Sequence, residues 1–390
     1  MITRRFGRTE IAMPVLSCGG MRYMYKWQDV EEKEIPRENQ RNLEATIRRA
    51  LELGIRHIET ARGYGTSERQ LGRLMPRLKR DEFILQTKVT PKKDVSEFVA
   101  EFHDSLKRLR VDFVDLFALH GLNNEELIGW ALKPNGCLAA ARKLQSEGRA
   151  RHIGFSTHAP LDLILEVIKH ERDGGFDYVN LHWYFIFQRN LPAIEEAARR
   201  DMGVFIISPS DKGGKLYDPG DEMRRLCAPL DPIVFNDLFC LRNPNVHTIS
   251  IGAARPGDFD LHLEAVRLLD QAEELVPPIV ERLEGRWRER LGEEFGRRWE
   301  EGLPNWKDTP GEVNIPVIVW LRNLARAYDL VGYGKLRYNL LGDGGHWFPG
   351  QKITAASSEE LRAACARSPF PEEIVSALME AHQLFHEEKK

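Results

Sequence analysis

Short apolar runs alternate with amphipathic segments between residues 15 and about 275, and this rhythm constrains the fold more than any other feature of the chain. Strands that alternate with helices in this way are typical of parallel sheets built from βα units. Eight such runs suit a closed barrel better than an open sheet. The sequence therefore predicts an α/β fold, a (β/α)8 TIM barrel, with strands at Val15–Cys18, Arg56–Ile58, Phe83–Thr87, Val114–Leu119, Ala150–Phe155, Tyr178–Leu181, Val204–Ile207 and Thr248–Ile251.

The length of the chain leaves room for more than a barrel. A (β/α)8 barrel takes about 250 residues, and this chain has 390. We expect the barrel to occupy residues 1–275, followed by a charged helical connector over residues 276–302, where Arg, Glu and Trp are frequent. Residues 303–390 then form a small, mostly helical C-terminal module.

Composition narrows the range of functions. The formal net charge is −3, which provides no basic field for nucleic acid. No apolar run approaches the ~20 residues of a membrane span, and the first residues lack the apolar stretch of a signal peptide. We therefore expect a cytoplasmic protein. The cysteines are scattered, which argues against a disulfide framework and against a Cys-x2-Cys metal site; they are Cys18, Cys137, Cys227, Cys240 and Cys365.

Polar residues follow the predicted strands, one group after another. In a (β/α)8 barrel, the functional groups lie at the carboxyl ends of the strands. A single lysine or histidine at a strand end is ordinarily structural, but a polar residue at most strand ends in turn predicts a reaction centre. These residues are Glu59, Thr60, Lys88, His120, Ser156, Thr157, His158, Asn180, His182 and Ser208.

Four segments resemble the aldo-keto reductase superfamily. The stretch from Gly54 to Gly72 contains Glu59 before Thr-Ala and Tyr64 five positions later, as in that family's signature. Residues 85–88 and 114–120 are similar to the segments with the family's catalytic lysine and histidine, and residues 153–156 to its fifth strand. The resemblance covers about residues 1–272. It implies an oxidoreductase that reduces an aldehyde or ketone, or oxidises the alcohol, by hydride transfer.

The resemblance also implies roles for four side chains. Tyr64 is expected to be the general acid, and a free phenol, with a pKa of about 10, needs a nearby cation to donate its proton at neutral pH. Lys88 supplies that cation, Glu59 holds Lys88, and His120 orients the substrate carbonyl. The family usually has Asp at position 59. We expect the extra methylene of Glu59 to displace Lys88 by about 1 Å, which can cost about 100-fold in rate.

The cofactor is expected to be held without a Rossmann turn, because only Gly19-Gly20 follows the first strand and no Gly-x-Gly-x-x-Gly occurs there. The family's glutamine on the sixth strand is replaced by Asn180, and its aromatic residue after the seventh by Ile207. Arg255 can pair with a 2′-phosphate and therefore favours NADP, with NAD as the alternative cofactor. Asp258 is expected to repel a phosphate. The residues implied in cofactor binding are Gly20, Met21, Ser156, Thr157, Asn180, Ser208, Pro209, Ser210, Lys212, Gly252, Ala253, Ala254, Arg255 and Asp258.

The C-terminal module resembles the ferredoxin-like domain of one branch of the superfamily. In that branch a Cys-x2-Cys-x2-Cys-Pro run precedes Val-Asn-Ile-Pro, whereas here residues 303–316 contain no cysteine. A cluster of this kind needs four thiolates, and the module contains only Cys365, so we expect no iron–sulfur cluster. The module is expected to serve in packing, as an interface for a protein partner or self-association, or as a lid.

Two other functions compete with a carbonyl reductase acting on a small molecule. The departures at Glu59, Asn180 and Ile207 are also compatible with a nucleotide-binding regulatory or scaffolding barrel with vestigial redox activity. A metal-dependent hydrolase using His57, His120, His158 and His182 is disfavoured, because no His-x-His follows the first strand. We expect no metal site.

Overall fold

The computed structural model describes residues 1–342, 347–353 and 357–387. Residues 343–346, 354–356 and 388–390 of the predicted C-terminal module lie outside this description. The chain divides into two compact units. The first comprises residues 1–213 and 236–272, and the second comprises residues 214–235 and 273–390.

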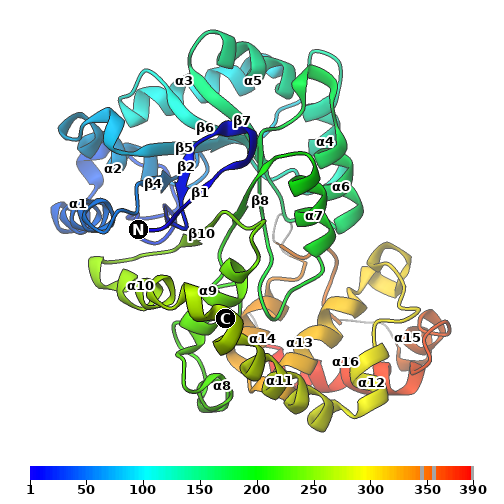
Figure 1. Ribbon diagram of the computed structural model, residues 1–390. Coiled ribbons are helices and arrows are strands. Elements are labelled where there is room, and N and C mark those ends of the chain that lie inside the picture. The colour runs from blue at the N-terminus through cyan, green and yellow to red at the C-terminus, as the bar shows by residue number, and fades with distance from the viewer. Residues whose placement is uncertain (343–346, 354–356, 388–390) are drawn as a thin grey trace. The chain divides into compact units, whose positions relative to one another are not determined.

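The first unit is a closed barrel of eight strands, which confirms the predicted (β/α)8 fold (Figure 1). Every neighbouring pair of barrel strands is parallel. The strands are almost continuously apolar because both of their faces are buried. They are β3 (Leu16–Gly19), β4 (His57–Glu59), β5 (Ile84–Val89), β6 (Val114–Leu119), β7 (Ala150–Ser156), β8 (Tyr178–Leu181), β9 (Gly203–Ile206) and β10 (Thr248–Ile251).

Helices of the first unit follow the strands and bury an apolar stripe against the barrel. Helix α1 ends at Glu52, and Gly54 follows its cap residue, Leu53, with a positive φ of 79°. Asp94 caps the start of α3, where its side chain accepts a hydrogen bond from the amide of Ser96. The helices are α1 (Arg37–Glu52), α2 (Ser67–Leu74), α3 (Val95–Leu109), α4 (Glu125–Leu132), α5 (Cys137–Ser146), α6 (Leu161–Lys169), α7 (Leu191–Arg199), α10 (Asp260–Arg267) and, from residue 236 on, α9 (Pro232–Arg242).

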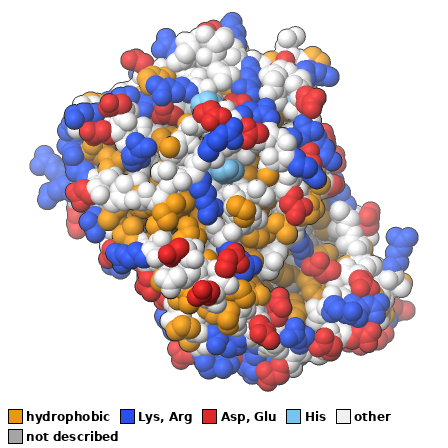
Figure 2. Space-filling view, viewed as in Figure 1, with side chains coloured by type: hydrophobic (Ala, Val, Ile, Leu, Met, Phe, Trp, Pro, Cys, Tyr) orange, Lys and Arg blue, Asp and Glu red, His pale blue; other side chains and the backbone are white. Residues whose placement is uncertain are grey.

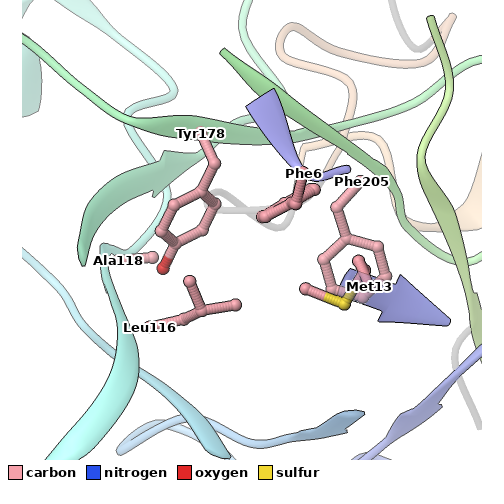
Figure 3. Packing of buried hydrophobic residues seen from close by; sticks show 6 residues of the cluster. All are labelled: Phe6, Met13, Leu116, Ala118, Tyr178 and Phe205. Atoms are coloured by element: carbon pink, nitrogen blue, oxygen red, sulfur yellow. The ribbon is translucent and has the colours of Figure 1, made fainter. Parts of the chain in front are cut away.

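An antiparallel hairpin closes the amino-terminal end of the barrel. It pairs β1 (Thr3–Arg5) with β2 (Ala12–Pro14), and Phe6, directly after β1, and Met13, within β2, enter a buried cluster. Figure 3 shows both side chains directed at the same core, whose other members are Leu116, Ala118, Tyr178 and Phe205. Because the hairpin fills this end, the opposite, carboxyl end is the mouth of the barrel. The sequence did not predict the hairpin.

The second unit is helical among its described residues. Helix α13 is buried almost all round, and it packs against α14 and α16. Glu380 joins Arg322 and Arg326 of α13 through contacts of 2.7 and 2.6 Å. The helices are α8 (Asp221–Cys227), α11 (Ala272–Leu291), α12 (Glu293–Arg298), α13 (Ile315–Tyr328), α14 (Val331–Asn339), α15 (Ser358–Ala364) and α16 (Pro371–Phe385).

Residues 214–235 belong to the second unit, a grouping that the sequence did not anticipate. Helix α8 is joined to α11 by two contacts: Arg282 Nε donates to the carbonyl of Leu226 at 2.7 Å, and Arg286 pairs with Glu222 at 2.8 Å. The segment predicted as a helical connector, residues 276–302, falls mostly within α11 and α12.

Charged side chains of both signs lie on the surface (Figure 2), and the cysteines lie in the interior. On the face seen in Figure 2, basic and acidic side chains are interspersed. Within the described residues, no helix combines the length and the apolar character that crossing a membrane requires. All five cysteines lie in the described part of the chain and are buried free thiols.

Candidate active site

Three consecutive strands bring the predicted reaction centre together. Glu59 is the last residue of β4, Lys88 is the second-last residue of β5, and His120 directly follows β6. Tyr64 stands in the loop after β4. Because β4, β5 and β6 are neighbours in the barrel, their carboxyl ends lie side by side. The four side chains therefore share one side of the mouth.

Glu59 and Lys88 form a buried ion pair. Their exposed fractions are 3% and 1%, and Lys88 Nζ contacts Glu59 Oε1 directly. Lys88 Nζ also donates to the carbonyl of Thr60 at 2.9 Å, and the amide of Gly20 donates to Glu59 Oε2 at 3.4 Å. Burial lowers the pKa of Lys88 well below its usual range, while the adjacent carboxylate favours the charged form. A charge buried this deeply requires such a partner.

Tyr64 is held between these two groups. Its hydroxyl donates to Glu59 Oε1 at 3.4 Å, and Lys88 Nζ lies 4.6 Å from the centroid of its ring. Burial, with a smaller contribution from Tyr23, raises the pKa of Tyr64 above its ordinary value. The phenol is therefore protonated at neutral pH, as a proton donor must be.

His120 faces the ring of Tyr64 edge-on. The two ring centroids are 5.6 Å apart, with an angle of 82° between the planes. Burial, followed by the charges of Lys88 and Lys212, lowers the pKa of His120 to about 3. A neutral imidazole offers one N–H donor, so His120 can hydrogen-bond a carbonyl oxygen without supplying a full charge.

The ends of β7, β8 and β9 provide polar groups that suit a nicotinamide dinucleotide. Asn180 is fully buried, and neither Oδ1 nor Nδ2 has a hydrogen-bond partner among the described residues. A carboxamide presents one donor and one acceptor group, which would satisfy both atoms. Ser210 Oγ is likewise buried without a partner in the described structure. These residues fit the dinucleotide that the sequence predicts.

Two other predicted cofactor residues have structural tasks. The hydroxyl of Thr157 donates to the carbonyl of Leu122 at 2.8 Å and accepts from the amide of Ala159 at 3.0 Å. Ser156 Oγ accepts from the amide of Gly121 at 3.0 Å. Both hydroxyls thus tie the end of β7 to the loop after β6.

The turn after β9 is tight. Ser208 has a φ of 54°, its carbonyl accepts from the amide of Lys212 at 2.9 Å, and the carbonyl of Pro209 accepts from Asn236 at 3.1 Å. A Cβ at Gly213 would lie 1.8 Å from the carbonyl oxygen of Pro209, so only glycine fits there. The turn places Ser210 and Lys212 at the end of the strand.

Gly20 and Met21 follow β3 at the mouth of the barrel. A Cβ at Gly20 would lie 2.6 Å from the carbonyl oxygen of Glu59, so this position also requires glycine. Met21 is 39% exposed. Close packing of Gly20 on Glu59 ties the first strand end to the buried ion pair.

The turn after β10 contains the last group of predicted residues. Asp258 accepts from the amide of Ala254 at 2.8 Å and from Arg255 Nε at 3.1 Å. The carbonyl of Gly252 accepts from Arg22 at 2.9 Å, and Ala253 is buried. The structure therefore brings Ala254, Arg255 and Asp258 together through the carboxylate of Asp258.

A histidine pair at the mouth was missed as a unit by sequence reasoning. His158 Nδ1 is hydrogen-bonded to His182 Nε2, and the rings are stacked with centroids 4.6 Å apart. Tyr184 Oη lies 2.9 Å from His182 Nδ1, and Lys212 Nζ lies 3.4 Å from His182 Nε2. Their positions after consecutive strands were the available signal. Within the described ranges, no group of three or more His, Cys, Asp or Glu side chains is placed to hold a metal ion.

Comparison with known proteins decides the family. Residues 15–218, more than half of the chain, match the model of the aldo/keto reductase family. The chain belongs to the aldo/keto reductase family. This is a family of NAD(P)-dependent oxidoreductases, so the resemblance seen in the sequence is confirmed at this level. The match ends before the C-terminal module, and the likeness of residues 303–390 to a ferredoxin-like domain stays a prediction.

Individual members of the family are distant. An aldo-keto reductase of Mycobacterium sp. (strain KMS) is 32% identical over 124 residues, which cover 30% of this chain and 41% of that protein. L-glyceraldehyde 3-phosphate reductase of Escherichia coli (strain K12) is 28% identical over 173 residues, 40% of this chain and 45% of that protein. The matched part thus spans less than half of either relative. An aldo-keto reductase of Bacillus halodurans, solved in its holo form, superposes on this chain with a TM-score of 0.57 and is 20% identical to it. The superposition covers 71% of this chain and 97% of that one, and it shows that the two proteins have the same fold.

Proposed function

We propose that this aldo/keto reductase reduces an aldehyde or ketone, or oxidises the corresponding alcohol, with Tyr64 as the general acid. The observation that carries the proposal is the position of the protonated phenol of Tyr64 against both Lys88 and neutral His120. A bound nicotinamide dinucleotide supplies the hydride. Proton donation by a positioned side chain typically contributes 10²–10⁴-fold to such a rate.

Each side chain of the proposed reaction centre has its own role. Tyr64 and His120 donate hydrogen bonds to the carbonyl oxygen and thereby orient it. The phenol then releases its proton to that oxygen. The tyrosinate left behind has Lys88 Nζ 4.6 Å from its ring centroid, and this cation stabilises the negative charge. Glu59 keeps Lys88 in place and charged.

The dinucleotide is proposed to lie along the ends of β7 to β10. Asn180 is suited to the nicotinamide carboxamide, and Ser210 with Lys212 to the pyrophosphate. The choice between NADP, which the sequence favours through Arg255, and NAD depends on the turn after β10. Neither the substrate nor the direction of the reaction is specified by these residues.

Binding and turnover test the proposal separately. NADH and NADPH are titrated by fluorescence, and the absorbance of the reduced cofactor is then followed with a panel of aldehydes and ketones. We expect binding of a dinucleotide and turnover that falls in Tyr64→Phe. Tyr25→Phe is the matched control, because it removes a hydroxyl from a side chain that is 38% exposed. If neither nucleotide binds, the proposal is wrong.

A second candidate is a nucleotide-binding regulatory or scaffolding barrel with vestigial redox activity. The observation that favours it is the hydrogen bond from Tyr64 to Glu59, which engages the proton that the reaction would use. This candidate predicts tight nucleotide binding without turnover, and no difference between the unmodified protein and Tyr64→Phe in any assay of the panel.

For residues 303–390 we propose a degenerate ferredoxin-like module that acts in packing or as an interface for a protein partner or a second copy. Support comes from α13, whose side chains are almost all buried and which packs against α14 and α16, and from the absence of cysteines other than Cys365 in residues 303–390. Size-exclusion chromatography with light scattering on the full chain tests self-association. A monomer across the accessible concentration range would rule out the interface with a second copy.

A further inference from the structure

The turn after β10 already contains an anion, supplied by the chain. Barrels of this class frequently bind a phosphate with the loops after the seventh and eighth strands and a short extra helix. Here the eighth strand, β10, leads into the short 3-10 helix η6 (Pro256–Phe259). The carboxylate of Asp258 accepts from the amide of Ala254 at 2.8 Å through one oxygen and from Arg255 Nε at 3.1 Å through the other. The amide of Ala254 and Nε of Arg255, two donors that a phosphate could use, are therefore engaged.

Asp258 is the more buried member of this pair, and Arg255 is the more exposed one. The side chain of Asp258 is 20% exposed, whereas that of Arg255 is 78% exposed. The turn itself is anchored, because Asn42 Nδ2 donates to the carbonyl of Ala254 at 2.6 Å. If Arg255 swings away, the amide of Ala254 still holds the carboxylate. A ligand that approaches this amide meets a negative charge whatever Arg255 does.

This arrangement suits a ribose 2′-hydroxyl and opposes a 2′-phosphate. A carboxylate accepts a hydrogen bond from the 2′-hydroxyl of NAD, as an acidic residue does in dinucleotide sites of other folds. A 2′-phosphate presents negative charge to the same carboxylate, and that carboxylate already accepts from Nε of Arg255 at 3.1 Å. The sequence assigned Arg255 to this phosphate, and the contacts of Asp258 work against that assignment.

We propose that Asp258 is a specificity-determining residue that makes this enzyme prefer NAD(H) to NADP(H). The inference rests on the proposed nicotinamide-dependent function and deepens it. Asp258 acts through two effects of one charge: it accepts from the ribose hydroxyl, and it excludes the phosphate. Specificity of this kind is a difference between two affinities, and it includes a repulsive element.

Asp258 also caps its own turn, and the substitution Asp258→Asn separates the two tasks. An asparagine oxygen still accepts from the amide of Ala254, so the cap is retained while the charge is lost. The matched control is Asp260→Asn. It removes the same charge two residues later, from an exposed side chain at the start of α10.

The experiment measures dissociation constants for NADH and NADPH by fluorescence titration of the full chain and both variants. We expect the unmodified protein to bind NADH at least about tenfold more tightly than NADPH. In Asp258→Asn, we expect the affinity for NADPH to rise by about tenfold or more, so that the preference is lost or reversed. Asp260→Asn is expected to keep the preference of the unmodified protein.

Each contrary result has a distinct meaning. Tighter binding of NADPH than of NADH by the unmodified protein would overturn the inference and leave the proposed function standing. An equal gain in NADPH affinity in Asp258→Asn and Asp260→Asn would also overturn it, because it would assign the effect to the general field of the protein. If neither nucleotide binds the unmodified protein, the proposed function and this inference fail together.

A competition assay on the unmodified protein keeps the inference testable if Asp258→Asn does not fold. Adenosine 5′-monophosphate and adenosine 2′,5′-bisphosphate differ only in the 2′-phosphate, and each is used to displace NADH. We expect the monophosphate to compete more strongly. Stronger competition by the bisphosphate would show that the turn accepts a 2′-phosphate and would overturn the proposal.

Discussion

The phenol of Tyr64 donates its hydrogen bond to Oε1 of Glu59 across 3.4 Å. The same oxygen contacts the ammonium of Lys88. One carboxylate oxygen therefore serves both the proton donor and the cation that is expected to activate it. In the proposed mechanism a substrate carbonyl competes with Glu59 for the phenol proton, and we expect this competition to slow the reaction.

Shortening Glu59 should release the phenol. In Glu59→Asp the carboxylate withdraws by one methylene, which frees Tyr64 while a carboxylate remains near Lys88. We expect kcat for an aldehyde to rise, by up to about 100-fold if the reacting groups gain about 1 Å of alignment, with the dissociation constant of the cofactor unchanged. Steady-state kinetics measure this. Glu44→Asp, which shortens a carboxylate paired with Arg77 on the surface, is the control. A fall in kcat would show that the longer side chain is required.

His120 should make stability depend on pH. Its pKa is about 3 in the fold against 6.5 ordinarily, because burial and the charges of Lys88 and Lys212 disfavour the imidazolium. Between these values the unfolded chain binds a proton that the folded chain does not. The free energy of unfolding therefore falls as the pH is lowered from 6.5 towards 3, by about 1 kcal/mol per pH unit for this residue. Urea unfolding at several pH values should give a shallower slope for His120→Asn; an unchanged slope would contradict the assignment.

Asn180 is expected to lower the stability of the protein without nucleotide and to strengthen binding of the dinucleotide. Its buried amide has no partner among the described residues, and a buried unsatisfied polar group costs about 1–3 kcal/mol. We expect Asn180→Leu, which is similar in size, to raise the Tm of the protein without nucleotide and to weaken binding of the dinucleotide. Thermal unfolding with and without NADH measures both effects. A lower Tm combined with unchanged affinity would mean that the amide has a structural partner instead.

The amino-terminal hairpin should contribute strongly to stability. Phe6 is fully buried in the cluster that closes the barrel, so Phe6→Ala should lower the free energy of unfolding by about 3–5 kcal/mol. Ile2→Ala, at a side chain that is 44% exposed, is the control. Denaturant unfolding measures the difference between the two. A loss below about 1 kcal/mol for Phe6→Ala would show that the hairpin is dispensable.

Periodicity predicted the barrel because each of its strands is an apolar run with helical segments around it. The same pattern predicted Glu59, Lys88 and His120 at strand ends, since strand ends meet at one face of a barrel whatever the loops do. The amino-terminal hairpin could not be predicted from this pattern, because tertiary contacts determine it. The hairpin strands are three residues long and carry no alternation of their own, and they are fixed by the tertiary contacts of Phe6 and Met13.

Long-range contacts also decided two other features. Residues 214–235 joined the second unit through bonds such as the one from Arg282 to Leu226, 56 positions apart, which no local pattern encodes. For Asp258, its charge was readable in the sequence, but its hydrogen bond to the amide of Ala254 was not. We propose that this bond turns a general repulsion of phosphate into a specific preference for NAD(H) over NADP(H).

The role of Tyr64 is tested most directly by a single turnover of the full chain. Protein saturated with reduced cofactor is mixed rapidly with an aldehyde that it turns over, and the decay of cofactor absorbance is compared with that of Tyr64→Phe. We predict a loss of about 10²–10⁴-fold in the rate of this decay, with the dissociation constant of the cofactor unchanged. An equal rate in the two proteins would contradict the assignment of Tyr64 as the proton donor.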